Sequence, residues 1–306
     1  MSLQASPDPR RRALTLLAVL ALVWGTNWPL FPLAVQEVSV WTFRGVSMLT
    51  AGALLLAIAR SRGQSLHIPR THWPVLIFAS WAYLLVWNVA SAYAAVLIPS
   101  GQAALLGFTM PLWAAALSWS LWREPMTGRT MLALASGAVG VGLLIWRGAH
   151  AYEQAPLGLA CGLVAAVGWA VGTLALKRGS LGGAAIPATV LTGWQLLIAG
   201  LPVALIALWR AHDAGQGWFV PSLTTLLVIG YITIVPMSLG NVAWFSIVGL
   251  LPGHVAGLSS IAVPMVAMVA GAWVHAEPLG VVQWAAMGCC AVGLWLSLPQ
   301  RSGSGS

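Results

Sequence analysis

Residues 99–125 read PSGQAALLGFTMPLWAAALSWSLWREP, and residues 252–278 read PGHVAGLSSIAVPMVAMVAGAWVHAEP. Each stretch starts with proline, has a second proline near its middle, Pro111 or Pro264, and ends in Glu-Pro. The two copies are offset by 153 residues, and other pairs along the chain share that offset. They include Asn88 with Asn241, Pro99 with Pro252, Gly140 with Gly293 and Leu143 with Leu296. One structural unit is therefore present twice.

The matched pairs define the domain organisation. The first repeat is predicted over residues 13–147 and the second over residues 156–298. Residues 1–12 are predicted to be a cytoplasmic tail, because the apolar run that follows them is too long for the core of a secretory signal. Residues 301–306, RSGSGS, resemble a linker added for expression and are excluded from the fold.

The composition indicates an integral membrane protein. Of 306 residues, 59% are hydrophobic and only 7% are charged, which is far from the balance of soluble domains. The six acidic residues leave little for acid–base chemistry, and the three cysteines lie in apolar segments, so we expect no metal, cofactor or disulfide. The net charge of +8 requires no nucleic-acid partner, because the basic residues lie at the ends of apolar runs.

Runs of about 20 apolar residues are long enough to cross a bilayer. Charged, glycine and proline clusters divide the chain into ten such runs, predicted at 13–35, 40–59, 73–95, 99–121, 128–147, 156–176, 186–209, 221–243, 252–274 and 279–298. Two copies of a unit with five spans have opposite orientations in the membrane. The predicted fold is an all-α membrane protein, with ten transmembrane helices in two inverted five-helix repeats around a central cavity.

Basic residues predict the orientation, because Lys and Arg accumulate in cytoplasmic loops. If the N-terminus is inside, only Arg147 and Arg210 lie outside, and Arg44 lies near the outer end of the second span. All other basic residues are then cytoplasmic: Arg10, Arg11, Arg12, Arg60, Arg62, Arg70, Arg123, Arg129, Lys177, Arg178 and Arg301. Both termini are therefore predicted to be cytoplasmic.

Aromatic and polar side chains in the middle of spans are candidates for a substrate site. Trp and Tyr normally collect at the membrane interfaces. Trp24 with Trp28, and Tyr83 with Trp87, instead lie within spans at a spacing of four, which places each pair on one helix face. The predicted substrate-binding residues are Trp24, Asn27, Tyr83, Trp87, Asn88, Trp169, Thr173, Asn241 and Ser259. The alternative is that the aromatic residues fill the core and the polar ones only bridge helices.

Pro111 and Pro264 lie near the middle of the fourth and ninth spans. A proline supplies no N–H, so the carbonyls of Gly107 and Ser260 lose their helical partners. In a bilayer such carbonyls need a partner inside the protein or beside a water-filled cavity. These four residues are interpreted either as hinges whose carbonyls accept a substrate ammonium or as packing kinks satisfied by a neighbouring helix.

Several charged residues have a local and a functional interpretation. Glu124 and Glu277 precede the next helix, where a carboxylate favours the helix N-terminus; the alternative is a gate or proton site. Arg44 either extends outward, pairs with Glu37, or attracts a carboxylate at the outer mouth.

Small-residue faces predict close packing of the two repeats. They are Gly158 with Gly162, Gly168 with Gly172, and Gly253 with Gly257. Such faces occur in any packed bundle and do not establish a dimer, so a monomer is favoured.

The missing motifs exclude several functions. No acidic or basic residue is predicted at the centre of a span, so proton coupling has no obvious carrier. A small multidrug-resistance pump would need a carboxylate in the first span. HExxH, a serine nucleophile motif and paired intramembrane aspartates are all absent, which argues against an enzyme. A neutral pore would also suit a channel, which saturable counterflow distinguishes from a carrier.

The first-span motif LVWGTNWPL, at 22–30, and the two stretches that end in Glu-Pro resemble the EamA-type repeats of the drug/metabolite transporter superfamily over residues 13–298. The Trp-rich first span with Tyr83, Trp87 and Tyr93 is most similar to YddG-type exporters of amino acids. This resemblance implies a ten-helix basket in a bacterial-type inner membrane and alternating access. It also implies export of amino acids, aromatic ones included, and of related small metabolites. Export of drugs or other metabolites is the alternative.

Overall fold

The computed structural model describes residues 9–179, 186–213, 221–250, 262–275 and 279–297. The regular secondary structure of these residues is entirely helical. In chain order the elements are α1 (Pro9–Gly25), η1 (Trp28–Leu30), α2 (Phe31–Ala34), α3 (Val40–Ser61), η2 (Arg70–His72), α4 (Trp73–Ala79), η3 (Ser80–Leu85), α5 (Val86–Leu97), α6 (Ser100–Gly107), α7 (Met110–Trp122), α8 (Gly128–Gln154), α9 (Pro156–Arg178), α10 (Ala188–Asp213), α11 (Leu223–Ile232), η4 (Thr233–Gly240), α12 (Asn241–Leu250), α14 (Ala262–His275) and α15 (Val281–Ser297).

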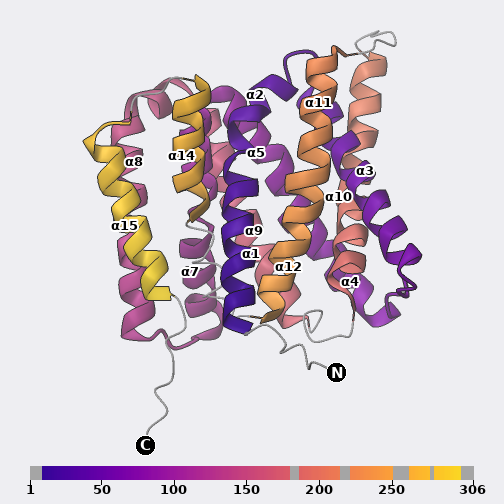
Figure 1. The fold of residues 1–306 in the computed structure, drawn as a ribbon, viewed down its shortest axis with the longest axis horizontal. Coiled ribbons are helices and arrows are strands. Elements are labelled where there is room, and N and C mark those ends of the chain that lie inside the picture. Colours follow the sequence, from indigo (N-terminus) through magenta and orange to yellow (C-terminus); the bar gives the residue numbers. More distant parts are fainter. Residues whose placement is uncertain (1–8, 180–185, 214–220, 251–261, 276–278, 298–306) are drawn as a thin grey trace, which may run out of the picture.

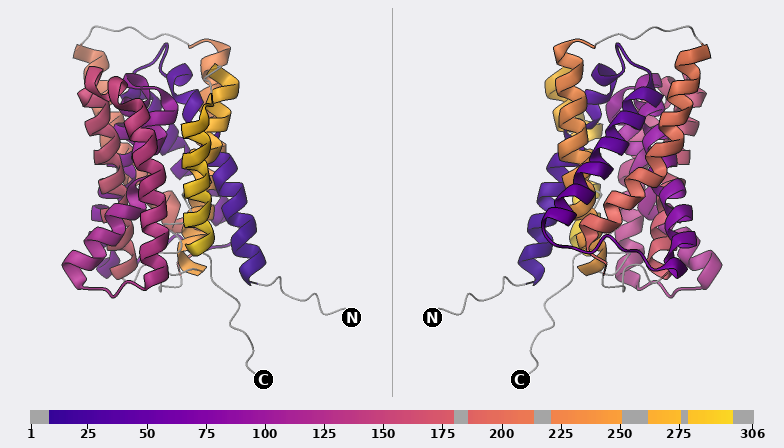
Figure 2. Two further views of the ribbon diagram at one scale, coloured as in Figure 1. Left: turned by 90° about the vertical axis from the view of Figure 1, so that its left-hand side faces the viewer. Right: turned by 90° about the vertical axis from the view of Figure 1, so that its right-hand side faces the viewer.

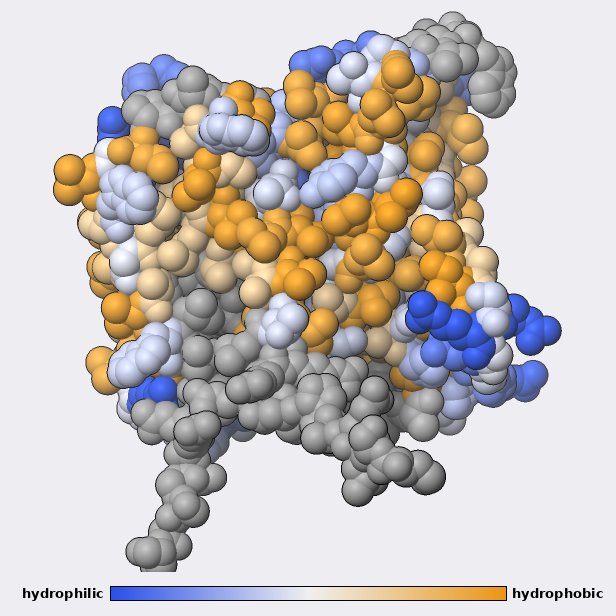
Figure 3. Space-filling view, viewed as in Figure 1, coloured by the Kyte–Doolittle hydropathy of each residue, from blue (hydrophilic) through white to orange (hydrophobic). Residues whose placement is uncertain are grey.

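Within the described residues, eight helical stretches are long and apolar enough to cross a membrane. They are Thr15–Ala34, Val40–Ser61, Arg70–Leu97, Gly101–Trp122, Gly128–His150, Pro156–Arg178, Ala188–Asp213 and Leu223–Ile247. Two shorter apolar helices, α14 and α15, follow. Hydrophobic residues cover the middle of the face shown in Figure 3, and hydrophilic ones gather towards its ends. The predicted all-helical membrane fold is confirmed.

The two halves of the chain run in opposite directions through the bundle. Helix α1 starts at the lower end in Figure 1, whereas α9 descends and ends there. The first described turn of α1 and the last of α15 lie at this same end, as both side views in Figure 2 show. An odd number of spans in each half produces this inversion.

Two outer helix pairs flank the centre of the bundle. Helix α3 packs along α10 on one side, and α8 packs along α15 on the other (Figure 1). Glycines allow both approaches: a Cβ on Gly45 would lie 2.9 Å from Ala204 Cα, and one on Gly293 would lie 2.9 Å from the Ala133 carbonyl oxygen. Helices α1, α5, α9 and α12 lie between these pairs (Figure 1).

Helix α9 joins the two halves through its small residues. Its glycines Gly158, Gly162, Gly168 and Gly172 are all closely covered by the first half of the chain. A Cβ on Gly172 would lie 2.7 Å from the backbone nitrogen of Tyr83, so only glycine fits this approach. The predicted close packing is confirmed for these four residues, whereas Gly253 and Gly257 lie outside the described residues.

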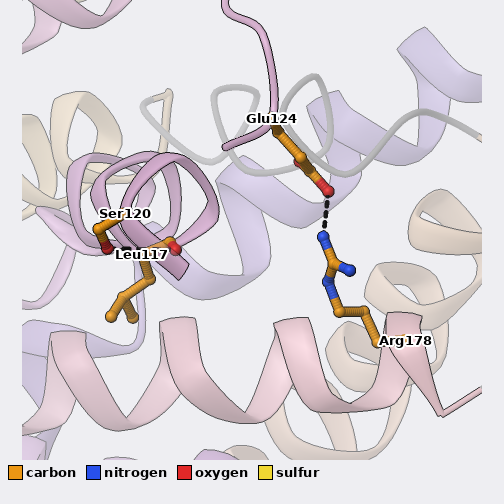
Figure 4. A network of polar contacts seen from close by, with 4 residues as sticks. All are labelled: Leu117, Ser120, Glu124 and Arg178. Carbon is orange, nitrogen blue, oxygen red and sulfur yellow. Dashed lines mark hydrogen bonds and ion pairs between the residues drawn. The ribbon is translucent and has the colours of Figure 1, made fainter. Parts of the chain in front are cut away.

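Glu124 does not cap the following helix, so that prediction was wrong. Helix α8 begins at Gly128, and Thr127 Oγ1 accepts the hydrogen bond from the Thr130 N–H (3.2 Å). Glu124 precedes the start of α8, and its carboxylate has its partner on another helix. Its Oε1 accepts from Arg178 Nη2 at 2.5 Å, which links the ends of α7 and α9 (Figure 4). Glu277 lies outside the described residues.

Gly172→Val should destabilise the protein by about 1–3 kcal/mol, because the added side chain displaces the backbone of η3. Gly142→Val is the matched control, since a Cβ there meets nothing within 4 Å. Thermal melting of purified protein in detergent measures both variants. Equal melting temperatures for the two variants would contradict the close approach of α9 and η3.

Candidate functional site

Two π-helical segments interrupt equivalent spans. Segment η3 begins at Ser80 and η4 at Thr233, which are separated by the 153-residue offset of the repeats. The α-helix continues after them at α5 and α12, two residues before Asn88 and directly at Asn241. Short π-helical segments within α-helices are frequent at functional sites, because they leave backbone groups outside the regular hydrogen-bond ladder. No sequence pattern predicted these two segments.

Polar side chains at equivalent positions donate to backbone carbonyls within both π-helical segments and in the helical turn before each of them. The four bonds run from Ser80 Oγ to Leu76 O (2.6 Å), from Thr233 Oγ1 to Ile229 O (2.7 Å), from Asn88 Nδ2 to Leu84 O (2.8 Å) and from Asn241 Nδ2 to Met237 O (2.7 Å). Each asparagine therefore uses its amide N–H on its own helix and retains Oδ1 for other partners. In Asn241, Oδ1 accepts from the Tyr83 hydroxyl at 3.2 Å, which joins the two halves.

An aromatic cluster of Trp24, Tyr83, Trp87, Trp169 and Trp244 fills the middle of the bundle. Trp169 is its centre: its ring centroid lies 4.1 Å from that of Tyr83, 4.5 Å from Trp87, 5.2 Å from Trp24 and 5.6 Å from Trp244. The pairs with Trp24 and Trp87 are edge-on, an arrangement that aromatic quadrupoles favour, and the pairs with Tyr83 and Trp244 are tilted. The cluster combines α1, η3 and α5 of the first half with α9 and α12 of the second.

Asymmetry between the halves makes room for Trp24. The positions equivalent to Tyr83 and Trp87 are Pro236 and Gly240. Trp24 Nε1 donates to the Pro236 carbonyl at 3.0 Å, and a Cβ on Gly240 would lie 2.4 Å from that nitrogen. The small residue of the second half therefore accommodates the indole that the first half supplies.

A first cavity, with a volume of about 40 Å³, lies against the cluster. Six of the predicted substrate-binding residues line it: Trp24, Asn27, Trp87, Asn88, Trp169 and Asn241. Tyr83 is fully buried behind it. The lining also includes eight residues outside the predicted substrate-binding set, namely Trp28, Phe31, Arg44, Leu84, Phe108, Ile232, Pro236 and Met237.

A second cavity, with a volume of about 130 Å³, also has Trp169 in its lining. Among the described residues its lining includes Trp244, Thr173 and Pro111, and it reaches the exposed Glu124 and Lys177 at the lower end of the bundle. Thr173 is therefore separated from the six residues of the first cavity. Trp169 lines both cavities and so lies between them.

The fourth span is broken beside Pro111, as its proline predicted. Helix α6 ends at Gly107 and α7 begins at Met110, with Thr109 Oγ1 donating to the Leu106 carbonyl at 2.6 Å. Gly107 packs against the indole of Trp87 in the aromatic cluster: a Cβ on Gly107 would lie 3.0 Å from Trp87 Cη2. Pro264 lies in the first turn of α14, and Ser259 and Ser260 lie outside the described residues.

Two residues that line the cavities, Trp244 and Arg44, were not in the predicted set of substrate-binding residues. Trp244 follows Asn241 by three positions, so helical spacing places both on one face and could have identified it. Arg44 was predicted to extend outward, to pair with Glu37 or to attract a carboxylate at the outer mouth. The first two interpretations were wrong, and the third stays a prediction. Its side chain is 1% exposed and lines the first cavity, while the Glu37 carboxylate accepts from the Ser222 N–H at 2.7 Å.

A family comparison identifies the chain. The EamA-like transporter family matches it twice, over residues 11–146 and 156–298. The chain belongs to the EamA-like transporter family. This EamA-like protein is therefore a multi-pass membrane transporter and not an enzyme.

Bacterial transporters of similar length resemble this EamA-like chain. The uncharacterized transporter YvbV of Bacillus subtilis is 26% identical over 271 residues, which cover 89% of this chain and 86% of YvbV. The uncharacterized inner membrane transporter YedA of Escherichia coli K12 is 26% identical over 276 residues, with the same two coverages. A probable amino-acid metabolite efflux pump of Salmonella typhimurium is 25% identical over 294 residues, covering 92% of this chain and 93% of the pump.

A solved crystal structure of a protein has the same fold. It matches with a TM-score of 0.72, over 94% of this chain and 96% of that chain, at 20% identity. The duplicated architecture of this EamA-like transporter is therefore one that has been determined experimentally.

Tyr83→Phe should lower stability by about 1 kcal/mol, because it removes the one hydroxyl that bonds to Asn241 Oδ1 and keeps the ring. Tyr93→Phe is the control, since Tyr93 packs against Trp41 through its ring. Thermal melting in detergent compares the two variants with the parent protein. A parent-like Tyr83→Phe protein would mean that this hydrogen bond does not hold the halves together.

Proposed function

We propose that this protein is a secondary transporter that exports amino acids, aromatic and other neutral ones, and related small metabolites by alternating access. The observation that carries the proposal is the position of Trp169 between two cavities. A carrier needs a binding region that is reached from each side in turn, and transporter sites commonly lie near the membrane midplane beside broken helices. Here the breaks are η3, η4 and residues 108–109.

The chemistry of the first cavity supports an amino acid as substrate. Indole faces of Trp24, Trp87 and Trp169 offer stacking surfaces for an apolar or aromatic side chain. Asn27, Asn88 and Asn241 add neutral hydrogen-bonding groups. Similarity to a protein named a probable amino-acid metabolite efflux pump supports the same substrate class.

The distribution of charge supports export. The lower end of the bundle in Figure 1 carries basic residues at or next to helix ends: Arg60, Arg62, Arg123, Lys177 and Arg178. By the positive-inside rule this end faces the cytoplasm. The larger second cavity reaches this end, so a cytoplasmic substrate enters there. We propose that residues 13–147 and 156–298 then move relative to each other and expose the first cavity to the outside.

The aromatic cluster favours a carrier over a channel-like facilitator. Its rings pack against one another across both halves, and Trp169 is the one described residue that lines both cavities. Passage requires the rings to move with each substrate, which limits the rate and makes transport saturable.

Proteoliposomes that contain the purified protein and unlabelled phenylalanine should accumulate labelled phenylalanine by counterflow. Trp169→Leu should reduce the initial rate about tenfold, because it removes a stacking surface while keeping an apolar residue. Trp209→Leu is the control, since Trp209 is exposed on the outer helix α10. Uptake without counterflow would favour a channel, and no effect of Trp169→Leu would exclude the cavities as the route.

A further inference from the structure

Arg44 is a buried guanidinium that faces the first cavity. It lies in the second turn of α3, and its side chain is 1% exposed. Arginine stays charged in proteins, and burying a charge costs free energy unless a partner compensates for it. The structure therefore has to supply a partner for Arg44 or leave that role to a ligand.

Two aromatic rings position the guanidinium without using its hydrogen-bond donors. Arg44 Cζ lies 4.1 Å from the centroid of the Phe31 ring and 4.6 Å from that of Phe43. These cation–π contacts stabilise the charge through the faces of the planar group. The N–H groups project from its edge, and those on Nε and Nη2 are buried with no hydrogen-bond partner.

The described carboxylates do not pair with Arg44: Asp213 ends α10, and the other three have contacts elsewhere. Hydrogen bonds from the Ser222 backbone, and from the Thr225 and Ser222 hydroxyls, lower the pKa of Glu37 and keep it charged near α11. Glu124 pairs with Arg178 at the far end of the bundle, and Glu153 lies beside His150. No described acidic residue forms an ion pair with Arg44.

We propose that Arg44 is the anchor for the carboxylate of the transported substrate in the first cavity. Nε and Nη2 lie on one edge of the guanidinium, the arrangement that binds the two oxygens of a carboxylate in parallel. Asn27 Oδ1 lines the same cavity and is also buried without a partner, so it can accept from a substrate ammonium. Trp24, Trp87 and Trp169 then face the side chain.

The substrate class is therefore a carboxylate with an apolar or aromatic side chain, and an α-ammonium strengthens its binding. The part of this inference that concerns the amino group rests on the proposed function, whereas the part that concerns the carboxylate does not. Cationic amines without a carboxylate are disfavoured, because the Arg44 charge repels them.

Binding of three probes to the purified full-length protein in detergent tests the proposal: phenylalanine, 3-phenylpropionate and 2-phenylethylamine. Arg44→Gln should weaken both carboxylates about tenfold to a hundredfold, the range expected for losing hydrogen bonds to a charged group. The amine should bind as well as before or better. Arg44→Lys keeps the charge without the paired donors, so it should weaken the carboxylates less.

Arg62→Gln is the matched control, because Arg62 is exposed beyond the other end of α3 and should leave all three affinities unchanged. If Arg44→Gln does not fold, the affinities of Arg44→Lys for the three probes test the proposal instead. Unchanged affinity for both carboxylates, an equal loss for all three probes, or no carboxylate binding by the parent protein would overturn the proposal. Arg44-dependent binding of 3-phenylpropionate without binding of phenylalanine would support it and would instead refute amino-acid export.

Discussion

Every backbone N–H and C=O within a bilayer needs a partner inside the protein, and this constraint connects the fold to the site. Regular helices satisfy it automatically, but η3, η4 and the break before α7 do not. At these places Ser80, Asn88, Thr109, Thr233 and Asn241 donate to backbone carbonyls three to four residues earlier. Two of these side chains, Asn88 and Asn241, also line the first cavity.

The duplication produces two halves with similar backbones, and differences between their side chains make the site asymmetric. The π-helical segments η3 and η4 recur at the 153-residue offset. In contrast, Tyr83 and Trp87 are replaced in the second half by Pro236 and Gly240. Trp24 occupies the space that Gly240 leaves. A symmetric site would present the same groups twice. This one presents indoles and Arg44 from the first half, with Trp169 and Asn241 from the second, which suits an asymmetric substrate.

The helical membrane spans and the duplication were predictable, because hydropathy and the 153-residue offset can be read directly from the sequence. The glycines of α9 and the break at Pro111 were also predictable, since small residues and prolines act through their own backbone. The π-helical segments η3 and η4 were not predictable, because such a segment depends on the tertiary contacts of the residues around it. The aromatic and amide residues were identified from their depth in the spans. Arg44 was assigned to the outer mouth, because the sequence does not show that Phe31 and Phe43 enclose its charge.

Reagent accessibility tests the central claim most directly, namely that Trp169 separates two cavities reached from opposite faces. In a background without native cysteines, Thr173→Cys probes the second cavity and Asn27→Cys the first. A membrane-impermeant thiol reagent should modify Thr173→Cys from the cytoplasmic face and leave Asn27→Cys unmodified from that face. Equally fast modification of both positions from one face, in the absence of substrate, would reveal a continuous pore and contradict the account.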